Sequence, residues 1–155
     1  MKKILSLLLI LAAASSGNVH AAASCSITSS AGGTLVNFGT YSLVSGDQDS
    51  MGQITLLCVP DVLLGLSVSY SVAIGSGGAG VFSPRRLSLG GYGLNYNLYR
   101  DPARTQIFGD GSAGTAAASG SCTGACAVNV HGRIFGGQLV PGGTYRDDVV
   151  VTLSF

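Results

Sequence analysis

The chain has 155 residues, 46% of them hydrophobic and 10% charged, and its formal net charge is +1 at pH 7. Beyond its first residues it holds no lysine and no glutamate, and six arginines are set against seven aspartates. A nearly neutral surface offers no electrostatic basis for binding nucleic acid or an anionic membrane, so we expect neither as a partner. The 24 glycines and the scarcity of helix-favouring residues predict an all-β chain.

The N-terminus carries the pattern of a secretory signal peptide. Two lysines precede an apolar run that ends near Ala14, and small residues follow as far as the alanines at 21–23. The run is too short to span a bilayer, and we expect no transmembrane segment elsewhere. The prediction is a signal peptide at residues 1–21 and one exported domain at 22–155.

Four cysteines, an even number, lie in the exported part of the chain, which predicts two disulfides formed in an oxidising compartment. Three pairings are possible. The short closure favours a bridge between Cys122 and Cys126, which leaves Cys25 to pair with Cys58. Zinc binding is less favoured, because His131 is the one histidine outside the signal and does not stand at ligand spacing.

The elements predicted along the chain are short strands with alternating polarity, separated by glycine-rich turns. In chain order the strands are expected at residues 35–38, 54–58, 66–74, 94–98, 128–134 and 149–155. Turns at such regular intervals are typical of an antiparallel sandwich or barrel. Residues 112–121, rich in alanine, glycine and serine, are expected to form an exposed loop closed by a Cys122–Cys126 bridge.

The last of these strands has no successor in the sequence. Val149, Val151, Leu153 and Phe155 alternate with their neighbours, so that they share one face of the strand. Nothing follows to cover this face. We therefore expect a strand from outside the chain to complete the sheet, and these four residues to border the site that accepts it.

The glycine run at 75–80 formally matches the fingerprint of a dinucleotide-binding loop. Residues 81–86 cannot open a helix of useful length, because Pro84 interrupts them, and the chain shows no alternation of strands with helices. A hairpin loop is the preferred interpretation. Arg85 and Arg86, next to this proline, are expected to lie in solvent where the following strand begins.

No combination of residues indicates catalysis, a metal site or a cofactor, so we do not predict an enzyme. His131 is the one candidate base, and alternation places it on the solvent side of its strand. Asp147 and Asp148 are neighbours on a strand, so their side chains point to opposite faces and cannot share a proton. Asp110 lacks the acidic neighbours of a calcium loop and is better explained as a turn residue.

Several short segments, in this order, together resemble the spore coat protein U domain family, which includes the pilin subunits of archaic (Csu-type) chaperone-usher pili. They are Asn-Phe-Gly-Thr-Tyr at 37–41, Gly-Gln-Ile-Thr-Leu-Leu-Cys at 52–58, Leu-Asn-Tyr-Asn-Leu-Tyr-Arg-Asp at 94–101, Phe-Gly-Asp-Gly at 108–111, Val-His-Gly-Arg-Ile at 130–134, and Gly-Thr-Tyr-Arg-Asp at 143–147. The closing strand to Phe155 continues the match.

The resemblance implies an incomplete immunoglobulin-like antiparallel β-sandwich, with an open groove beside the C-terminal strand. It implies a secreted structural subunit assembled by donor-strand complementation, with a periplasmic chaperone, an outer-membrane usher and neighbouring pilus subunits as partners. The subunit would pass through the periplasm to a pilus or the cell surface and support adhesion or biofilm formation. The resemblance also assigns Cys25 and Cys58 as the disulfide of the domain.

The chain departs from the family at its N-terminus. Signal cleavage near Ala21 leaves only a few small residues before Cys25, too few for a donor strand. We therefore expect a subunit that accepts a strand without giving one, in a terminal or accessory position. The Cys122 and Cys126 pair is not part of the family pattern either.

Two other functions remain open on the sequence. In a self-contained extracellular binding module, residues 39–51 would fold back to complete the sheet, and Tyr92, Phe108 and Phe135 would be candidate contacts, although core packing suits each of them. In a hydrolytic enzyme, His131 would be indispensable.

Overall fold

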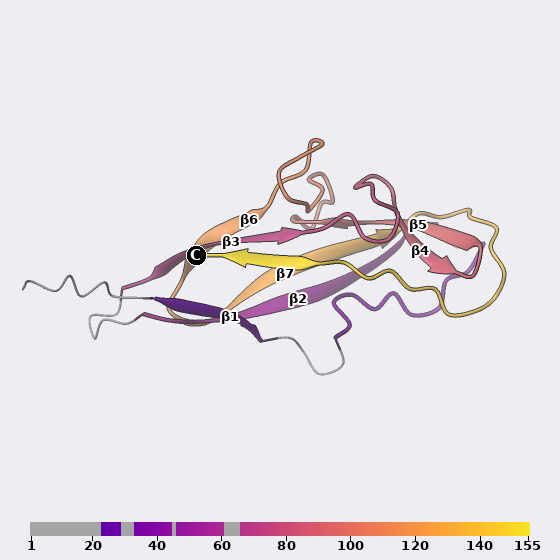
Figure 1. Ribbon diagram of the computed structural model, residues 1–155. Helices are drawn as coiled ribbons and strands as arrows, with labels where there is room; N and C mark the ends of the chain where they lie inside the picture. The colour runs from indigo at the N-terminus through magenta and orange to yellow at the C-terminus, as the bar shows by residue number, and fades with distance from the viewer. Residues whose placement is uncertain (1–22, 29–32, 45, 61–65) are drawn as a thin grey trace, which may run out of the picture.

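The computed structural model describes residues 23–28, 33–44, 46–60 and 66–155, so the predicted signal peptide at 1–21 lies outside the described residues (Figure 1). The described residues form eight strands. They are β1 (Ser24–Thr28), β2 (Gln48–Val59), β3 (Val68–Ile74), β4 (Arg85–Leu89), β5 (Tyr92–Tyr99), β6 (Ala118–Cys122), β7 (Gly124–Ile134) and β8 (Val151–Ser154). In the part of the chain so described, no helix is long and apolar enough to cross a membrane.

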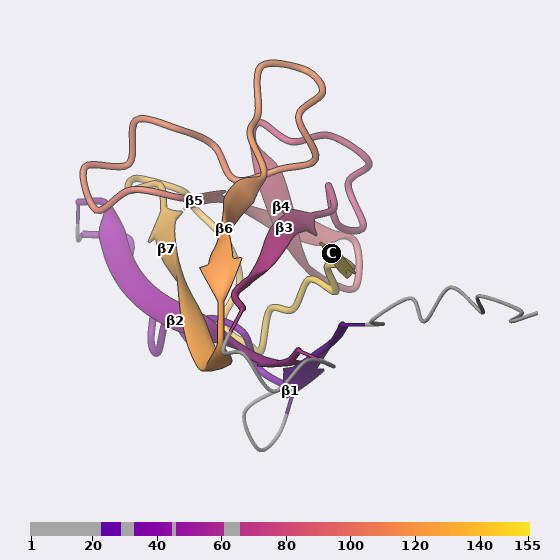
Figure 2. The same ribbon diagram turned by 90° about the vertical axis from the view of Figure 1, so that its left-hand side faces the viewer.

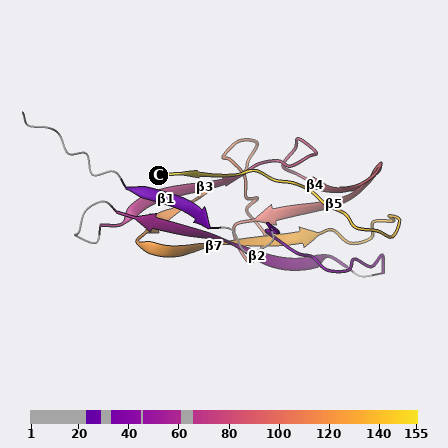
Figure 3. The same ribbon diagram turned by 60° about the horizontal axis from the view of Figure 1, so that its bottom comes forward.

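The strands form two antiparallel sheets, which confirms the all-β sandwich. One sheet has the order β1-β2-β7-β5-β4 and the other the order β6-β3-β8. Figure 2, which looks along the molecule, shows the two layers. β1 and the C-terminal end of β8 lie at the same end of the molecule in Figures 1 and 3. Each of these two strands pairs on one side only, β1 with β2 and β8 with β3.

The core lies between the sheets and follows the alternation seen in the sequence. The inward positions of β2, β3, β5 and β7 are apolar and nearly all fully buried. They are Ile54, Leu56, Cys58, Val68, Val72, Ile74, Leu94, Tyr96, Leu98, Val128, Val130 and Ile134. The strands predicted at 54–58, 94–98 and 128–134 are therefore confirmed, and the strand predicted at 66–74 begins at Val68.

The strand predicted at 35–38 is wrong, because none of these residues belongs to a strand of either sheet. The segment lies across the inner face of β2 and β7, where two glycines leave room for it. A Cβ at Gly52 would stand 1.7 Å from the carbonyl oxygen of Leu35, and a Cβ at Gly132 would stand 2.6 Å from Phe38. Side chains replace a strand ladder here, since Ser50 Oγ donates to the Asn37 carbonyl at 2.6 Å.

Both disulfides pair as short closure favoured. Cys25 and Cys58 are register partners of β1 and β2, so their bridge fastens an edge strand to the sheet. Cys122 ends β6 in one sheet, and Cys126 lies near the start of β7 in the other, so the second bridge spans the corner between the sheets. The loop predicted at 112–121 is wrong in its second half, where β6 begins at Ala118.

Two polar residues expected in solvent are buried instead. Arg85 has no exposed surface, because the carbonyls of Gly75 and Phe108 close over its guanidinium and accept hydrogen bonds from it, whereas Arg86 is exposed as expected. His131 is only 9% exposed. It points away from the core as predicted, but the loop that follows β5 folds over this side of the sheet, where Arg104 Nε donates to the Gly132 carbonyl at 3.3 Å.

Candidate functional site

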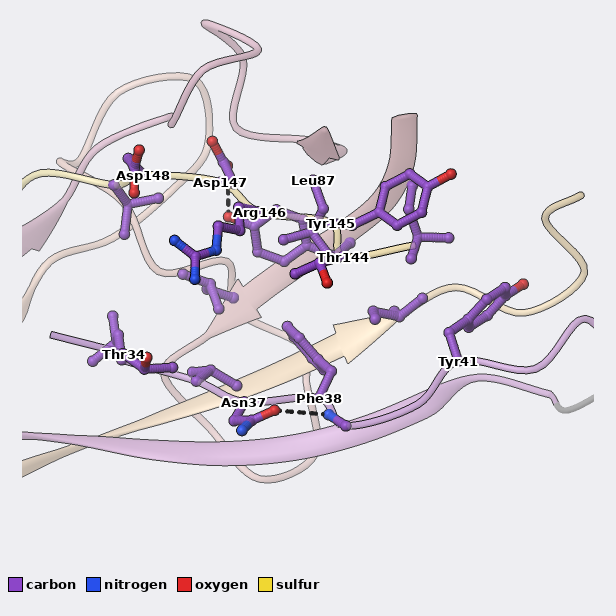
Figure 4. A pocket seen from close by; sticks show the side chains of 18 of the residues that line it. Thr34, Asn37, Phe38, Tyr41, Leu87, Thr144, Tyr145, Arg146, Asp147 and Asp148 are labelled. Atoms are coloured by element: carbon purple, nitrogen blue, oxygen red, sulfur yellow. Dashed lines mark hydrogen bonds between the residues drawn. The ribbon is translucent and has the colours of Figure 1, made fainter. Parts of the chain in front are cut away.

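A groove of about 890 Å³ runs along one side of the sandwich, where the three-stranded sheet does not cover the five-stranded one. One wall is the segment at 33–41, and the other is the segment at 140–149 together with Val151 (Figure 4). The floor is largely apolar and comes from β2, β5 and β7. It consists of Ile54, Leu94, Tyr96, Leu98 and Ile134.

The wall at 33–41 is fixed by hydrogen bonds to its backbone. The side chain of Gln48 donates to the Phe38 carbonyl, and Asn37 Oδ1 accepts from the Gly39 N–H at 2.9 Å. The Phe38 ring meets the Tyr96 ring edge to face, with centroids 5.9 Å apart. At one end of the groove the Gln138 N–H donates to the Tyr41 hydroxyl at 2.7 Å, which ties the wall at 33–41 to the chain just before the opposite wall.

The opposite wall changes sheets along its length. Arg146 and Ser88 of β4 exchange two backbone hydrogen bonds, of 2.7 and 3.1 Å. Four residues later Val150 accepts a 2.8 Å hydrogen bond from the Gly75 N–H, where the chain joins β3. Between these points the side chain of Asp147 accepts from the Tyr96 hydroxyl at 2.7 Å. Burial, and then this hydrogen bond, raise the pKa of Tyr96.

On the edge of β8 that faces away from β3, the backbone N–H and C=O groups have no neighbouring strand of the described residues to pair with. Backbone N–H and C=O groups alternate in direction along an antiparallel strand. Because Val150 directs its carbonyl to β3, the groups of Val149, Val151 and Leu153 point the other way. An edge of this kind is a template for another strand.

The four residues predicted to border a strand-acceptor site do not all lie in the groove. Val149 and Val151 line it, and Leu153 packs against the core without lining it. Phe155 follows the end of β8 and is 60% exposed. Their role in accepting a strand stays a prediction.

The sequence pattern does not indicate that Phe38 or Tyr96 lines a groove. It places Tyr96 in the middle of an alternating strand. The segment 37–41 carries part of the resemblance to the family, but that resemblance does not indicate its position. A signal for its position was present in Gly52 and Gly132, since a glycine inside a strand often marks the close approach of another backbone.

The aromatic residues considered for a binding module differ in their burial. Tyr92 is 57% exposed, Phe108 is fully buried in the core, and Phe135 is partly buried. The described residues of the segment at 39–51 supply part of one wall and the start of β2, and none of them pairs with β8. Asp110 accepts hydrogen bonds from Ser112, which lower its pKa, as expected for a turn residue.

Asp147 is partly buried and Asp148 exposed, and neither lies in a strand, because β8 begins at Val151. Among the described residues, no three histidine, cysteine, aspartate or glutamate side chains are grouped so that they could hold a metal ion.

Two antiparallel sheets that pack around one core, with no long helix among the described residues, are consistent with an immunoglobulin-like sandwich. The Spore Coat Protein U domain matches residues 11–152, and the chain belongs to this family. It is 34% identical over 139 residues to Protein U of Myxococcus xanthus, an alignment that covers 84% of this chain and 77% of that protein.

The fold is similar to that of one chain in the crystal structure of the CsuC–CsuE chaperone–tip adhesion subunit pre-assembly complex, from the archaic chaperone-usher Csu pili of Acinetobacter baumannii. The TM-score is 0.57 and the sequence identity 18%, so this likeness concerns the fold. It covers 86% of this chain but only 40% of the chain in that complex.

Proposed function

We propose that the chain is an exported structural subunit of a chaperone-usher pilus or surface coat, and that it is assembled by donor-strand complementation. The observation that carries this proposal is the groove of about 890 Å³, which runs beside the edge of β8 that no strand of the described residues pairs with. Membership of the Spore Coat Protein U domain family supports it, as does the shared fold with a chain of a chaperone–subunit complex. Both point to a structural subunit rather than an enzyme.

The geometry suits an incoming strand in two ways. The N–H and C=O groups of Val149, Val151 and Leu153 are available for a main-chain ladder. Alternate side chains of the strand would enter the groove and cover its floor, which is how β-augmentation combines affinity with specificity. A periplasmic chaperone would supply this strand first, and a neighbouring subunit would replace it at an outer-membrane usher.

Co-export with its cognate periplasmic chaperone tests the proposal. We expect the chain to aggregate or be degraded when exported alone, and to purify as a soluble one-to-one complex when the chaperone is present, because the strand then covers the floor of the groove. Size-exclusion chromatography with light scattering measures the stoichiometry. A soluble, stable monomer obtained without any chaperone would contradict donor-strand complementation.

A charge placed in the groove should abolish this complex. In Val149→Asp the new carboxylate points toward the apolar floor, so covering it with a strand would carry an unpaired charge out of water. We expect at least a tenfold loss of co-purified chaperone, because the free-energy penalty for burying a polar group without a partner is large enough to weaken binding by that factor.

The matched control is Val150→Asp, which places the same carboxylate on the adjacent residue, whose side chain is 72% exposed. It should leave the yield of the complex unchanged. Equal yields from the two variants would mean that the partner does not enter the groove.

The position of the subunit in the assembly is the finer part of the proposal. If the exported chain starts near Ala22, too few residues precede Cys25 to form a donor strand. The subunit would then occupy a terminal or accessory position and support adhesion or biofilm formation from there. N-terminal sequencing of the exported protein checks this, and a start that leaves a long alternating segment before Cys25 would contradict it.

A further inference from the structure

The glycine run at 75–80 holds a carboxylate of the groove wall. The Gly78 N–H donates to Asp147 Oδ1 at 2.7 Å. Gly77 has a φ of +74°, and a Cβ there would stand 2.2 Å from Asp147 Oδ2, inside contact distance. A run that resembles a phosphate-binding loop is therefore fitted to a side chain of the same protein.

Tyr96 holds the other oxygen of this carboxylate. Its side chain is 3% exposed, and its hydroxyl donates to Asp147 Oδ2 at 2.7 Å. A buried hydroxyl without a partner destabilises a fold, and a phenylalanine would fill this position in the floor without that cost. The hydroxyl therefore serves the contact with Asp147. Both oxygens of Asp147 are thus bound, one by the loop and one by the floor.

This contact falls between two points at which backbone hydrogen bonds fasten the wall to the sheets. The backbone bonds between Arg146 and Ser88 precede Asp147, and the bond from Gly75 to Val150 follows it. Residues 147–149 lie between them and outside any strand. Val149, which lines the groove, is two residues from Asp147.

Tyr96 also contacts the opposite wall, because its ring meets Phe38 edge to face. One residue of the floor therefore touches both walls and sets the distance between them. A groove whose width is set before the partner arrives loses less conformational entropy on binding than one that must order at that moment.

We propose that Tyr96 is a positioning residue for strand acceptance: with Gly77 and Gly78 it grips the Asp147 carboxylate and so pre-forms the groove. The inference rests on the proposed function and adds a device to it. The residues that grip the carboxylate, Tyr96, Gly77 and Gly78, are called the Asp147 latch below.

The test measures how tightly the groove takes up a strand. The chain, unfolded in urea with its disulfides intact, is diluted into buffer that contains a fluorescein-labelled synthetic peptide of alternating valine and threonine, and anisotropy reports the affinity. Tyr96→Phe keeps the packing but loses the hydrogen bond to a charged group, and we expect the peptide to bind about tenfold more weakly. Tyr99→Phe removes the same hydroxyl from a tyrosine of β5 that does not line the groove, and it should bind as the wild type does.

A second variant approaches the latch from the loop. Gly77→Ala places a methyl group 2.2 Å from Asp147 Oδ2, so the carboxylate must move, and the change should weaken peptide binding at least as much as Tyr96→Phe does. Its control is Gly80→Ala, because Gly80 has a similar φ of +70° but no atom within 4 Å of the added Cβ. The strain of a positive φ is common to both, so a difference between them reports the carboxylate.

The outcomes separate the latch from the proposed function. If Tyr96 only stabilised the fold, Tyr96→Phe would lower the urea midpoint of the peptide-bound and peptide-free protein alike and leave the affinity unchanged, which would overturn the latch. An equal loss of affinity in Tyr99→Phe or Gly80→Ala would also overturn it. If the wild-type chain takes up neither the peptide nor a version of it with prolines at alternate positions, strand acceptance itself is overturned, and the latch with it. If the chain binds the unmodified peptide but not the proline version, strand acceptance is supported.

Discussion

Replacing Arg85 with methionine is expected to lower the free energy of unfolding by about 3 kcal/mol or more. The guanidinium is fully buried and donates to the carbonyls of Gly75 and Phe108 and to Asn97 Oδ1, at 2.9, 2.7 and 2.8 Å. Methionine fills much of the space but leaves these acceptors without a donor, and each unsatisfied buried group costs about 1–3 kcal/mol.

Arg85 differs from a buried ion pair in what can replace it. An ion pair can often be exchanged for apolar residues without loss, because both charges are removed together. The main acceptors of Arg85 are backbone carbonyls, which no substitution removes. Its burial also lowers its own pKa, and no carboxylate of the described residues lies within salt-bridge distance to offset this. The carbonyl oxygens and the Asn97 side chain carry that stabilisation instead.

The control for this prediction is Arg86→Met, the same change at the next residue of β4, where the side chain is exposed. It should shift the free energy of unfolding by less than about 0.5 kcal/mol. Urea unfolding followed by tyrosine fluorescence, on wild type and both variants each in complex with the alternating valine–threonine peptide, gives the three values. An Arg85→Met variant as stable as Arg86→Met would show that water replaces the guanidinium at this site.

The sequence predicted correctly which face of a strand a residue lies on, but it did not predict which polar residues are buried. Alternation placed Leu94, Tyr96 and Leu98 inside because a strand has a period of two, which does not depend on the rest of the fold. It could not show that loops distant in sequence would close over Arg85 and His131. Burial of a polar residue depends on which backbone groups meet it, and those contacts are long-range.

Local sequence identified only one wall of the groove. The C-terminal strand could be recognised from its alternation, and Val149 and Val151 line the groove. The opposite wall could not be recognised in this way, because the segment around Phe38 has no strand ladder and is held by side chains of β2. Its position depends on the two glycines of the sheet below it, Gly52 and Gly132, which fit no alternation pattern.

Removal of the Cys25–Cys58 bridge is expected to be the other large effect. In Cys25→Ala with Cys58→Ala, the unfolded chain regains the freedom of a loop with a sequence separation of 33. The chain-entropy relation gives about 4 kcal/mol for a loop of this length. Removing Cys122 and Cys126 in the same way opens a separation of 4 and should cost about 2 kcal/mol.

The two bridges should also differ in their effect on the groove. Cys25 fastens β1, an edge strand whose one neighbour is β2, and Ile27 of β1 lines the groove. Loss of this bridge loosens the groove at that end, so we expect weaker uptake of the alternating valine–threonine peptide. The Cys122–Cys126 bridge lies at the corner between β6 and β7, and neither cysteine lines the groove, so its loss should leave peptide affinity unchanged.

Urea unfolding without reductant and peptide anisotropy measure the two effects on the same pair of double variants. Stability alone would not separate them, since both variants are expected to be less stable than wild type. Peptide affinity separates the two variants, because only the Cys25–Cys58 bridge holds an element of the groove. Equal loss of affinity in both would show that the groove responds to global stability, and a larger stability loss on removal of the short bridge would show that native-state strain outweighs loop entropy in this fold.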